Sequence, residues 1–167
     1  MLLCFMRHAH AEAGTGIGDP VRQLSPQGRA QLQQLLPLVR ALQVRPDWII
    51  SSPYQRALQT AQIVAEGLGY TRDIISDISL SPTGSTVGLQ ALLIAFVRCE
   101  QLLLVGHAPS MPTWIRELCG ASQFRLSFSP GAICCVELPE PQRWNGTLRW
   151  LVSLEPEHGV SYAESSV

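Results

Sequence analysis

Short apolar runs that each end in a cluster of polar residues recur along this chain, and they constrain its fold most strongly. Leu2 to Met6, Trp48 to Ile50 and Leu102 to Val105 have the length and character of buried strands. Apolar residues at helical spacing predict helices at 25–42, 54–68, 86–97 and from Pro109 or Pro112 to Gly120. This alternation predicts a mostly parallel sheet with helices packed on it.

The C-terminal part of the chain has a different pattern. Two apolar segments, Ala132 to Leu138 and Leu148 to Leu154, flank Asn145-Gly146, which is a strong hairpin signal. A further short strand is expected at 74–78. We therefore expect an α/β fold, a three-layer α/β/α sandwich with a mostly parallel central sheet and a C-terminal antiparallel hairpin. The 167 residues suit one domain at 1–154, followed by a surface tail at 155–167.

Composition narrows the chemistry that the chain can perform. Hydrophobic residues make up 46% and charged residues only 15%, which argues against disorder. All 12 basic residues are arginines, and the sequence contains no lysine. This excludes Schiff-base chemistry on a lysine and a Walker-type phosphate loop. Any anion that the protein binds must be held by guanidinium groups.

Charge and cysteine content indicate where the protein works. The net charge of −1 and the absence of a basic stripe argue against a nucleic-acid partner. The apolar N-terminus has no preceding positive segment, and the apolar stretch at 89–97 is far shorter than the ~20 residues of a membrane span. The five cysteines contain no C-x-x-C pair and are expected to be reduced. We expect a cytoplasmic protein with no membrane partner; the sequence indicates no oligomeric state.

Polar residues that follow the predicted strands are expected to meet in space. Arg7 and His8 follow the first strand, Arg56 lies just after the second, and His107 follows the strand at 102–105. The carboxyl ends of parallel strands share one edge of a sheet, where ligands bind. Two arginines and two histidines form a cage for an oxyanion. A phosphoryl group fits best, because arginine binds its oxygens in a bidentate manner and keeps its charge.

These segments resemble motifs of a known family. Arg7-His8-Ala9 resembles the Arg-His-Gly signature of the histidine phosphatase (phosphoglycerate mutase-like) superfamily. The segment from Ser51 to Ala61 is similar to its second-arginine motif, and Leu104 to His107 to its second-histidine motif. The chain is short, like the SixA-type protein-histidine phosphatases, and 19–28 and 80–84 also resemble that branch.

The resemblance implies a role for each matching residue. His8 is expected to be the nucleophile and to form a phosphohistidine that water hydrolyses. Arg7 and Arg56 are expected to neutralise the phosphoryl oxygens, and His107 to donate a hydrogen bond to them. Arg22 and Ser52 are expected to help bind the substrate. The scheme needs neither a cofactor nor a metal ion.

Two departures from the family pattern bear on the substrate. Ala9 replaces the glycine after the nucleophile, which is harmless only if its φ is negative. The stretch from Leu80 to Ser85 lacks the carboxylic acid that protonates an alkoxide leaving group in other branches. A phosphoramidate P–N bond needs less help, so the gap favours phosphohistidine over sugar phosphates. Glu12 or Asp77 could still supply the proton.

Other interpretations stay open at this stage. A small-molecule phosphomonoesterase, or a phosphate- or phosphoprotein-binding module without turnover, would share the same motifs. A metal site built from His8, His10, Glu12 and His107 is disfavoured, because the two neighbouring arginines would repel a cation. The glycine-rich segment at 14–18 is expected to be a mobile loop at the rim of the site.

Overall fold

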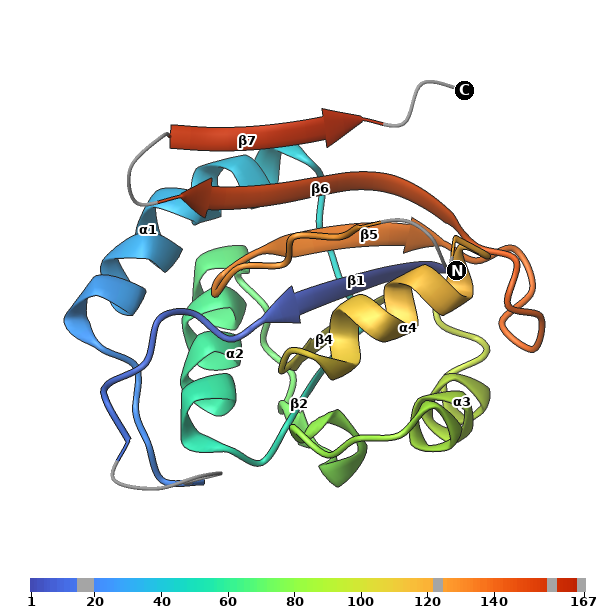
Figure 1. The fold of residues 1–167 in the computed structure, drawn as a ribbon, viewed down its shortest axis with the longest axis horizontal. Coiled ribbons are helices and arrows are strands. Elements are labelled where there is room, and N and C mark those ends of the chain that lie inside the picture. Colours follow the sequence, from blue (N-terminus) through green and yellow to red (C-terminus); the bar gives the residue numbers. More distant parts are fainter. Residues whose placement is uncertain (15–19, 122–124, 156–158, 165–167) are drawn as a thin grey trace.

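The computed structural model describes residues 1–14, 20–121, 125–155 and 159–164, and it contains one seven-stranded sheet (Figure 1). The strand order is β3-β2-β4-β1-β5-β6-β7. Four neighbouring strands are parallel: β3 (Ile75–Ser76), β2 (Trp48–Ser51), β4 (Gln101–Gly106) and β1 (Leu2–Arg7). The other three are antiparallel: β5 (Ile133–Glu137), β6 (Thr147–Glu155) and β7 (Gly159–Glu164).

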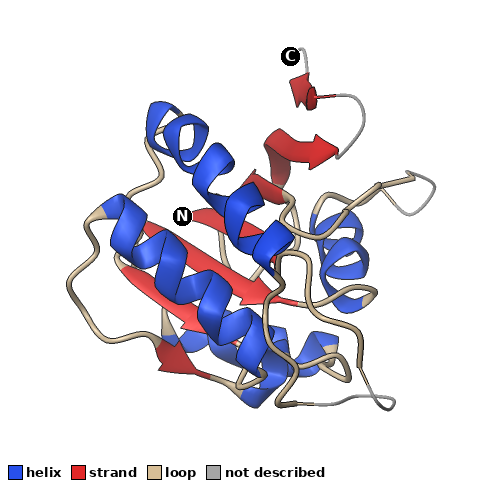
Figure 2. Cartoon of the chain, turned by 90° about the vertical axis from the view of Figure 1, so that its left-hand side faces the viewer, coloured by secondary structure: helices blue, strands red, loops and turns tan. Residues whose placement is uncertain are grey.

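Helices lie on both sides of the sheet, which confirms the expected α/β/α sandwich (Figure 2). The helices α1 (Pro26–Ala41) and α2 (Gln55–Leu68) share a core with Cys4 and Met6 of β1. The helices α3 (Thr86–Ala95) and α4 (Ser110–Leu118) share the other core with Leu3 and Phe5. Alternate residues of β1 therefore enter opposite cores, as the two-residue period of a strand requires.

Local signals account for where the helices begin and end. The hydroxyl of Ser25 accepts a hydrogen bond from the Gly28 amide at the start of α1, and Pro26 follows at the position that proline favours. Gly69 ends α2 in the left-handed conformation, with φ of 67°. The helix expected at 86–97 ends earlier, at Ala95.

The strand expected at 74–78 is only two residues long. Asp77 ends it, because its side chain accepts a hydrogen bond of 2.8 Å from the Ser79 amide and caps the 3-10 helix η1 (Ile78–Leu80). The backbone that would extend the strand therefore enters η1 instead.

The C-terminal hairpin is confirmed, but the tail expected at 155–167 is wrong in part. β6 extends to Glu155, and residues 159–164 form β7, which pairs with β6 and lies at the edge of the sheet (Figure 1). β7 forms because its backbone pairs with β6, an interaction that the pattern of its own residues does not reveal. In the hairpin, Cys134 and Cys135 enter opposite cores, as adjacent residues of a strand must.

Most of the glycine-rich segment at 14–18 lies outside the described residues, as does Asp19. Among the helices that the structure describes, none is long and apolar enough to cross a membrane.

Candidate active site

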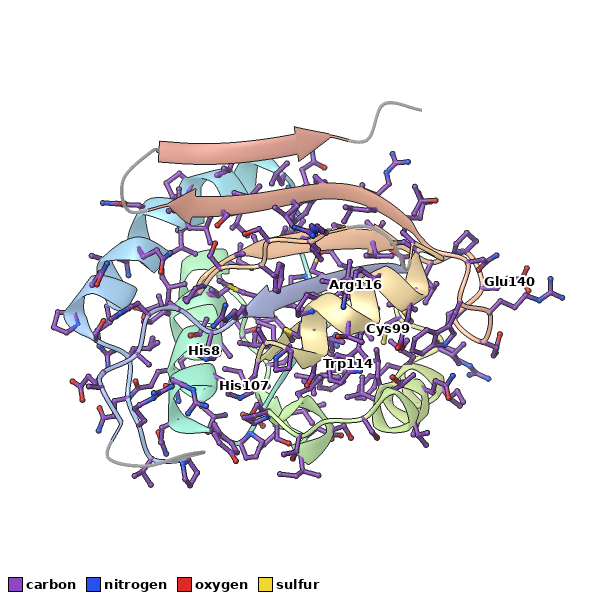
Figure 3. All side chains as sticks on the ribbon, in the orientation of Figure 1. His8, Cys99, His107, Trp114, Arg116 and Glu140 are labelled. Atoms are coloured by element: carbon purple, nitrogen blue, oxygen red, sulfur yellow. The ribbon has the colours of Figure 1, made fainter. Side chains whose placement is uncertain are left out.

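The parallel strands bring the predicted site residues together at one edge of the sheet. β1 and β4 are in register to their last residues, Arg7 and Gly106, and β2 ends beside Val105. The backbone continues the pairing beyond the strands, since the His8 amide donates to the Gly106 carbonyl and the Ser52 amide to the Val105 carbonyl. The side chains of His8 and His107 consequently lie close together, with ring centroids 5.0 Å apart (Figure 3).

The hydrogen bonds of His8 determine its tautomer. Its Nδ1 lies 2.8 Å from the carbonyl oxygen of Ala9, which can only accept, so Nδ1 carries the proton. Its Nε2 accepts a hydrogen bond of 3.2 Å from Nε of Arg56. In the neutral ring Nε2 therefore holds the lone pair, and it is directed toward a guanidinium group. This is the arrangement of an imidazole nucleophile that acts through Nε2.

Arg56 connects the two histidines. It lies in the first turn of α2 with only 5% of its side chain exposed. Its Nη2 donates to Nδ1 of His107 at 3.3 Å, in addition to the Nε bond to His8. The guanidinium carbon lies 4.9 Å from the centre of the Tyr54 ring, so a cation–π contact fixes one of its faces.

His107 is held by hydrogen bonds at both ring nitrogens. Since Nδ1 accepts from Arg56, Nε2 carries the proton and donates to the hydroxyl of Ser52 at 2.9 Å. Ser52 is buried and also accepts from the Tyr54 amide. Ser52 therefore lies in the site, where its hydroxyl orients His107. The N–H that the sequence analysis expects to face the phosphoryl group is directed at Ser52 instead.

Both histidines are neutral at physiological pH. Burial, which is the largest cause, and the charges of Arg56, Arg7 and Arg22 together lower the pKa of His8 to about 4. Burial, as the largest cause, together with His8 and the same arginines lowers the pKa of His107 to about 2. The arginines that could bind an oxyanion thus also keep His8 unprotonated.

Two further arginines have polar atoms available to a ligand. Arg7 donates from Nη1 to the Phe128 carbonyl at 2.8 Å, but its Nε is buried and has no partner among the described residues. The same is true of Nε of Arg22, which lies close enough to lower the pKa of both histidines. Buried donors without a partner carry a desolvation penalty that a bound anion would relieve. Arg22 therefore lies close to the group of two arginines and two histidines predicted from sequence.

Thr60 is a site residue that the sequence analysis missed. Its side chain is fully buried, and its hydroxyl donates to the Arg56 carbonyl at 2.7 Å. The same oxygen accepts from the amide of Ala9, the residue after His8, at 3.2 Å. One hydroxyl therefore ties the backbone at His8 to the helix that carries Arg56. The only sequence signal is its position one helical turn after Arg56.

The structure bears on both departures from the family pattern, the alanine after His8 and the missing carboxylic acid. Among the described residues other than glycine, only Gln43 has a positive φ, so the alanine at position 9 causes no backbone strain. Glu12 is exposed, and the carboxylate of Asp77 is engaged in capping η1. Neither acid is among the charges that shift the pKa of His8 or His107.

The alternative metal site does not form from the residues proposed for it. His10 is exposed, and its Nδ1 lies 2.7 Å from the hydroxyl of Ser25, away from the His8 ring contacts. Among the residues described, no group of three or more histidine, cysteine or acidic side chains is placed to hold a metal ion.

Comparisons with known proteins show similarity in sequence and in fold. The sequence profile of the histidine phosphatase superfamily (branch 1) matches residues 3–82. The chain is 28% identical to phosphohistidine phosphatase SixA of Escherichia coli strain K12, over 92% of this chain and 94% of that protein. It is similar to the structure of the protein histidine phosphatase SixA complexed with tungstate, with a TM-score of 0.80, 26% identity and coverage of 90% of this chain and 96% of the other.

A more distant similarity shows the fold alone. A phosphoserine phosphatase from Entamoeba histolytica, in complex with 3-phosphoglyceric acid, has a TM-score of 0.60 and 19% identity. The match covers 81% of this chain and 89% of that one.

Proposed function

We propose that this chain, which is similar to the histidine phosphatase superfamily over residues 3–82, removes phosphate from a phosphohistidine side chain of a signalling or phosphotransfer protein. The reaction proceeds through a phosphohistidine intermediate at Nε2 of His8 and needs no metal ion. The observation that carries this proposal is the neutral His8 ring, with its proton held on Nδ1 by the Ala9 carbonyl and its lone pair on Nε2 beside Arg56.

The arginines supply the electrostatic stabilisation. An incoming phosphoryl group takes over the Nε–H of Arg56 from His8, which frees the Nε2 lone pair for in-line attack. The partnerless Nε atoms of Arg7 and Arg22 bind the other oxygens. As negative charge enters the site, it favours a proton on Nδ1 of His107, which can then donate a hydrogen bond to the substrate.

The leaving group supports phosphohistidine as the substrate class. The sequence analysis named two carboxylates as possible proton donors, and neither is directed at His8. Glu12 is exposed, and Asp77 caps η1. An alkoxide leaving group would forgo general acid catalysis, which is typically worth ~10²–10⁴-fold. An imidazole that is protonated on its other nitrogen leaves as a neutral ring and does not need that help. The five free cysteines support a reducing compartment, and we place the enzyme in the cytoplasm.

Phosphate release from a phosphohistidine protein and from a panel of phosphate monoesters tests this proposal. Wild type is expected to prefer the phosphohistidine protein, and His8→Ala to lose turnover of both. His10→Ala is the matched control, because it removes an exposed imidazole two residues away. Preference for the monoesters would establish a small-molecule phosphomonoesterase instead. Phosphate binding without turnover of any substrate would establish a binding module.

A further inference from the structure

We propose that Val21, Tyr54 and Ile78 form a docking surface for the protein that carries the phosphohistidine. The occupant is the partner's own surface around that residue, made of apolar or uncharged side chains, and the contact favours a protein over a small phosphorylated molecule. The inference rests on the proposed function, and it names the part of this chain that recognises the substrate beyond its phosphoryl group.

Two of these apolar side chains are open to solvent. Val21 and Ile78 are each 68% exposed, and Tyr54 is half-buried. A single apolar residue on a surface is ordinary, whereas apolar side chains gathered beside a polar site indicate contact with another molecule. The inference therefore depends on where these three residues lie relative to the arginines and histidines of the site.

Val21 is held at the site by the residues on either side of it. The Gln55 amide donates to the Pro20 carbonyl at 2.8 Å, which fixes the chain before Val21 against the start of α2. On the other side, the charge of Arg22 adds to burial in lowering the pKa of both site histidines. Val21 therefore lies at the rim of the site, between the start of α2 and an arginine of the site.

Ile78 reaches the site from another part of the chain. The Asp77 amide donates to the Ser51 carbonyl at 2.9 Å, so η1 begins beside the end of β2. The next residue of that strand end, Ser52, bonds to His107 through its hydroxyl. Ile78 is therefore one residue from a backbone hydrogen bond that joins η1 to the site.

Tyr54 lies between these two segments and contacts the site directly. Its ring centre is 5.1 Å from that of His107, in an edge-on arrangement, and 4.9 Å from the guanidinium carbon of Arg56. In Figure 1 the chain from residue 20, the first turn of α2 and η1 lie along the lower side of the molecule. The three side chains of the docking surface thus border one site.

The charges of the site and its rim indicate the chemistry of the partner. Arg7, Arg22 and Arg56 place positive charge around the two histidines, and a phosphoryl group supplies the complementary negative charge. The side chains of the docking surface are uncharged, and they gain free energy when another apolar surface covers them. A protein that presents a phosphohistidine on an uncharged surface satisfies both parts at once.

Steady-state kinetics with two substrates tests the inference. One substrate is a phosphotransfer domain phosphorylated on its histidine, and the other is phosphoramidate, which has a P–N bond but no protein surface. The variants are Val21→Ser, Ile78→Ser and the double variant, because serine removes the apolar group without adding charge beside the anion site. Both positions are exposed, so the variants are expected to fold.

The matched control is Ile94→Ser, which removes an exposed apolar side chain far from the site. Ile94 is 57% exposed near the end of α3. The ring of Phe96, two residues later, packs against Trp48 at the start of β2, and the site lies where β2 ends. His8→Ala supplies the blank for uncatalysed loss of phosphate from both substrates.

We expect the double variant to lose about tenfold in kcat/KM for the phosphorylated domain, mainly through a higher KM. That loss corresponds to about 1.4 kcal/mol, which is within what covering two such side chains contributes. Each single variant should lose about threefold. Turnover of phosphoramidate by all variants, and of both substrates by Ile94→Ser, should stay within about twofold of wild type.

Each other result overturns the inference. An unchanged kcat/KM for the phosphorylated domain in the double variant would show that the surface makes no contact with it. An equal loss with phosphoramidate would show that the substitutions disturb the site itself, and an equal loss in Ile94→Ser would show an effect of any exposed apolar residue. A wild-type dimer in light scattering that the double variant abolishes would assign the surface to a second copy of the chain.

Failure of the proposed function has a different signature. In that case wild type itself would release phosphate from neither substrate faster than the His8→Ala blank. That result would overturn the proposed function and this inference with it, whereas failure of the docking surface alone leaves wild-type turnover of both substrates intact.

Discussion

The two buried histidines make the stability of the fold depend on pH, and replacing His107 isolates this effect. In the folded protein the pKa of His8 is lowered to about 4 and that of His107 to about 2, chiefly by burial. In the unfolded chain both return to about 6.5. Below that pH the unfolded chain binds protons that the folded protein does not bind. The stability that the two neutral histidines contribute is therefore fully present above pH 6.5. It is lost as the pH falls from 6.5 toward their pKa values in the folded protein.

The size of the effect follows from this proton difference. Each histidine contributes a slope of up to about 1.4 kcal/mol per pH unit, which amounts to roughly 2 kcal/mol per histidine between pH 7 and pH 5. Both rings are more than nine-tenths buried, with 7% of His8 and 2% of His107 exposed, so solvent screening is small. His107→Gln retains a donor for Ser52 but removes one titrating group. The variant should lose about 2 kcal/mol less than wild type over this interval.

Urea unfolding at pH 7 and at pH 5 measures the difference for wild type, His107→Gln and the control His10→Gln. The control replaces an exposed histidine, so its loss of unfolding free energy is expected to equal that of wild type. The acidic residues are the same in all three proteins, so their contributions cancel in the comparison. Equal losses in wild type and His107→Gln, within about 0.5 kcal/mol, would show that His107 is not kept neutral by the fold and would refute the reasoning.

Three further substitutions test other parts of the site. Thr60→Val leaves the buried Ala9 amide without an acceptor and should cost about 1–3 kcal/mol of unfolding free energy and lower kcat, whereas Thr60→Ser should restore both. Gly28→Ala would place a Cβ 2.1 Å from the His10 carbonyl oxygen, and thermal unfolding should show a loss of about 1–3 kcal/mol; an unchanged Tm would contradict the tight contact. Arg22→Gln should raise KM for a phosphohistidine protein about tenfold with a smaller effect on kcat, and an unchanged KM would remove Arg22 from the cage.

The sequence was sufficient to predict the architecture and to predict that four polar residues would lie together at one edge of the sheet. Apolar runs such as Leu102 to Val105 are fully buried in β4, and their length and composition distinguish them from helices. The polar residues after such runs converge because parallel strands share one edge, a topological rule that needs no coordinates. Arg7, His8, Arg56 and His107 could therefore be placed together in advance.

What the sequence could not predict depends on distances between elements. The role of Thr60 arises only because α2 packs beside the backbone at Ala9, and threonine within a helix usually makes a local hydrogen bond of the kind that Thr60 also makes to Arg56. The edge strand β7 depends on pairing with β6 rather than on its own pattern. The proton positions on His8 and His107 depend on which neighbour each nitrogen meets.

The two hydrogen bonds of Arg56 cover the lone pairs of both imidazoles. One guanidinium group lies 3.2 Å from Nε2 of His8 and 3.3 Å from Nδ1 of His107. A transition-metal ion or another electrophile would have to displace this buried cation to reach His8, and a metal ion would be repelled by it. An anionic phosphoryl group would attract the guanidinium, so under the proposed mechanism the substrate itself exposes the lone pair that attacks it.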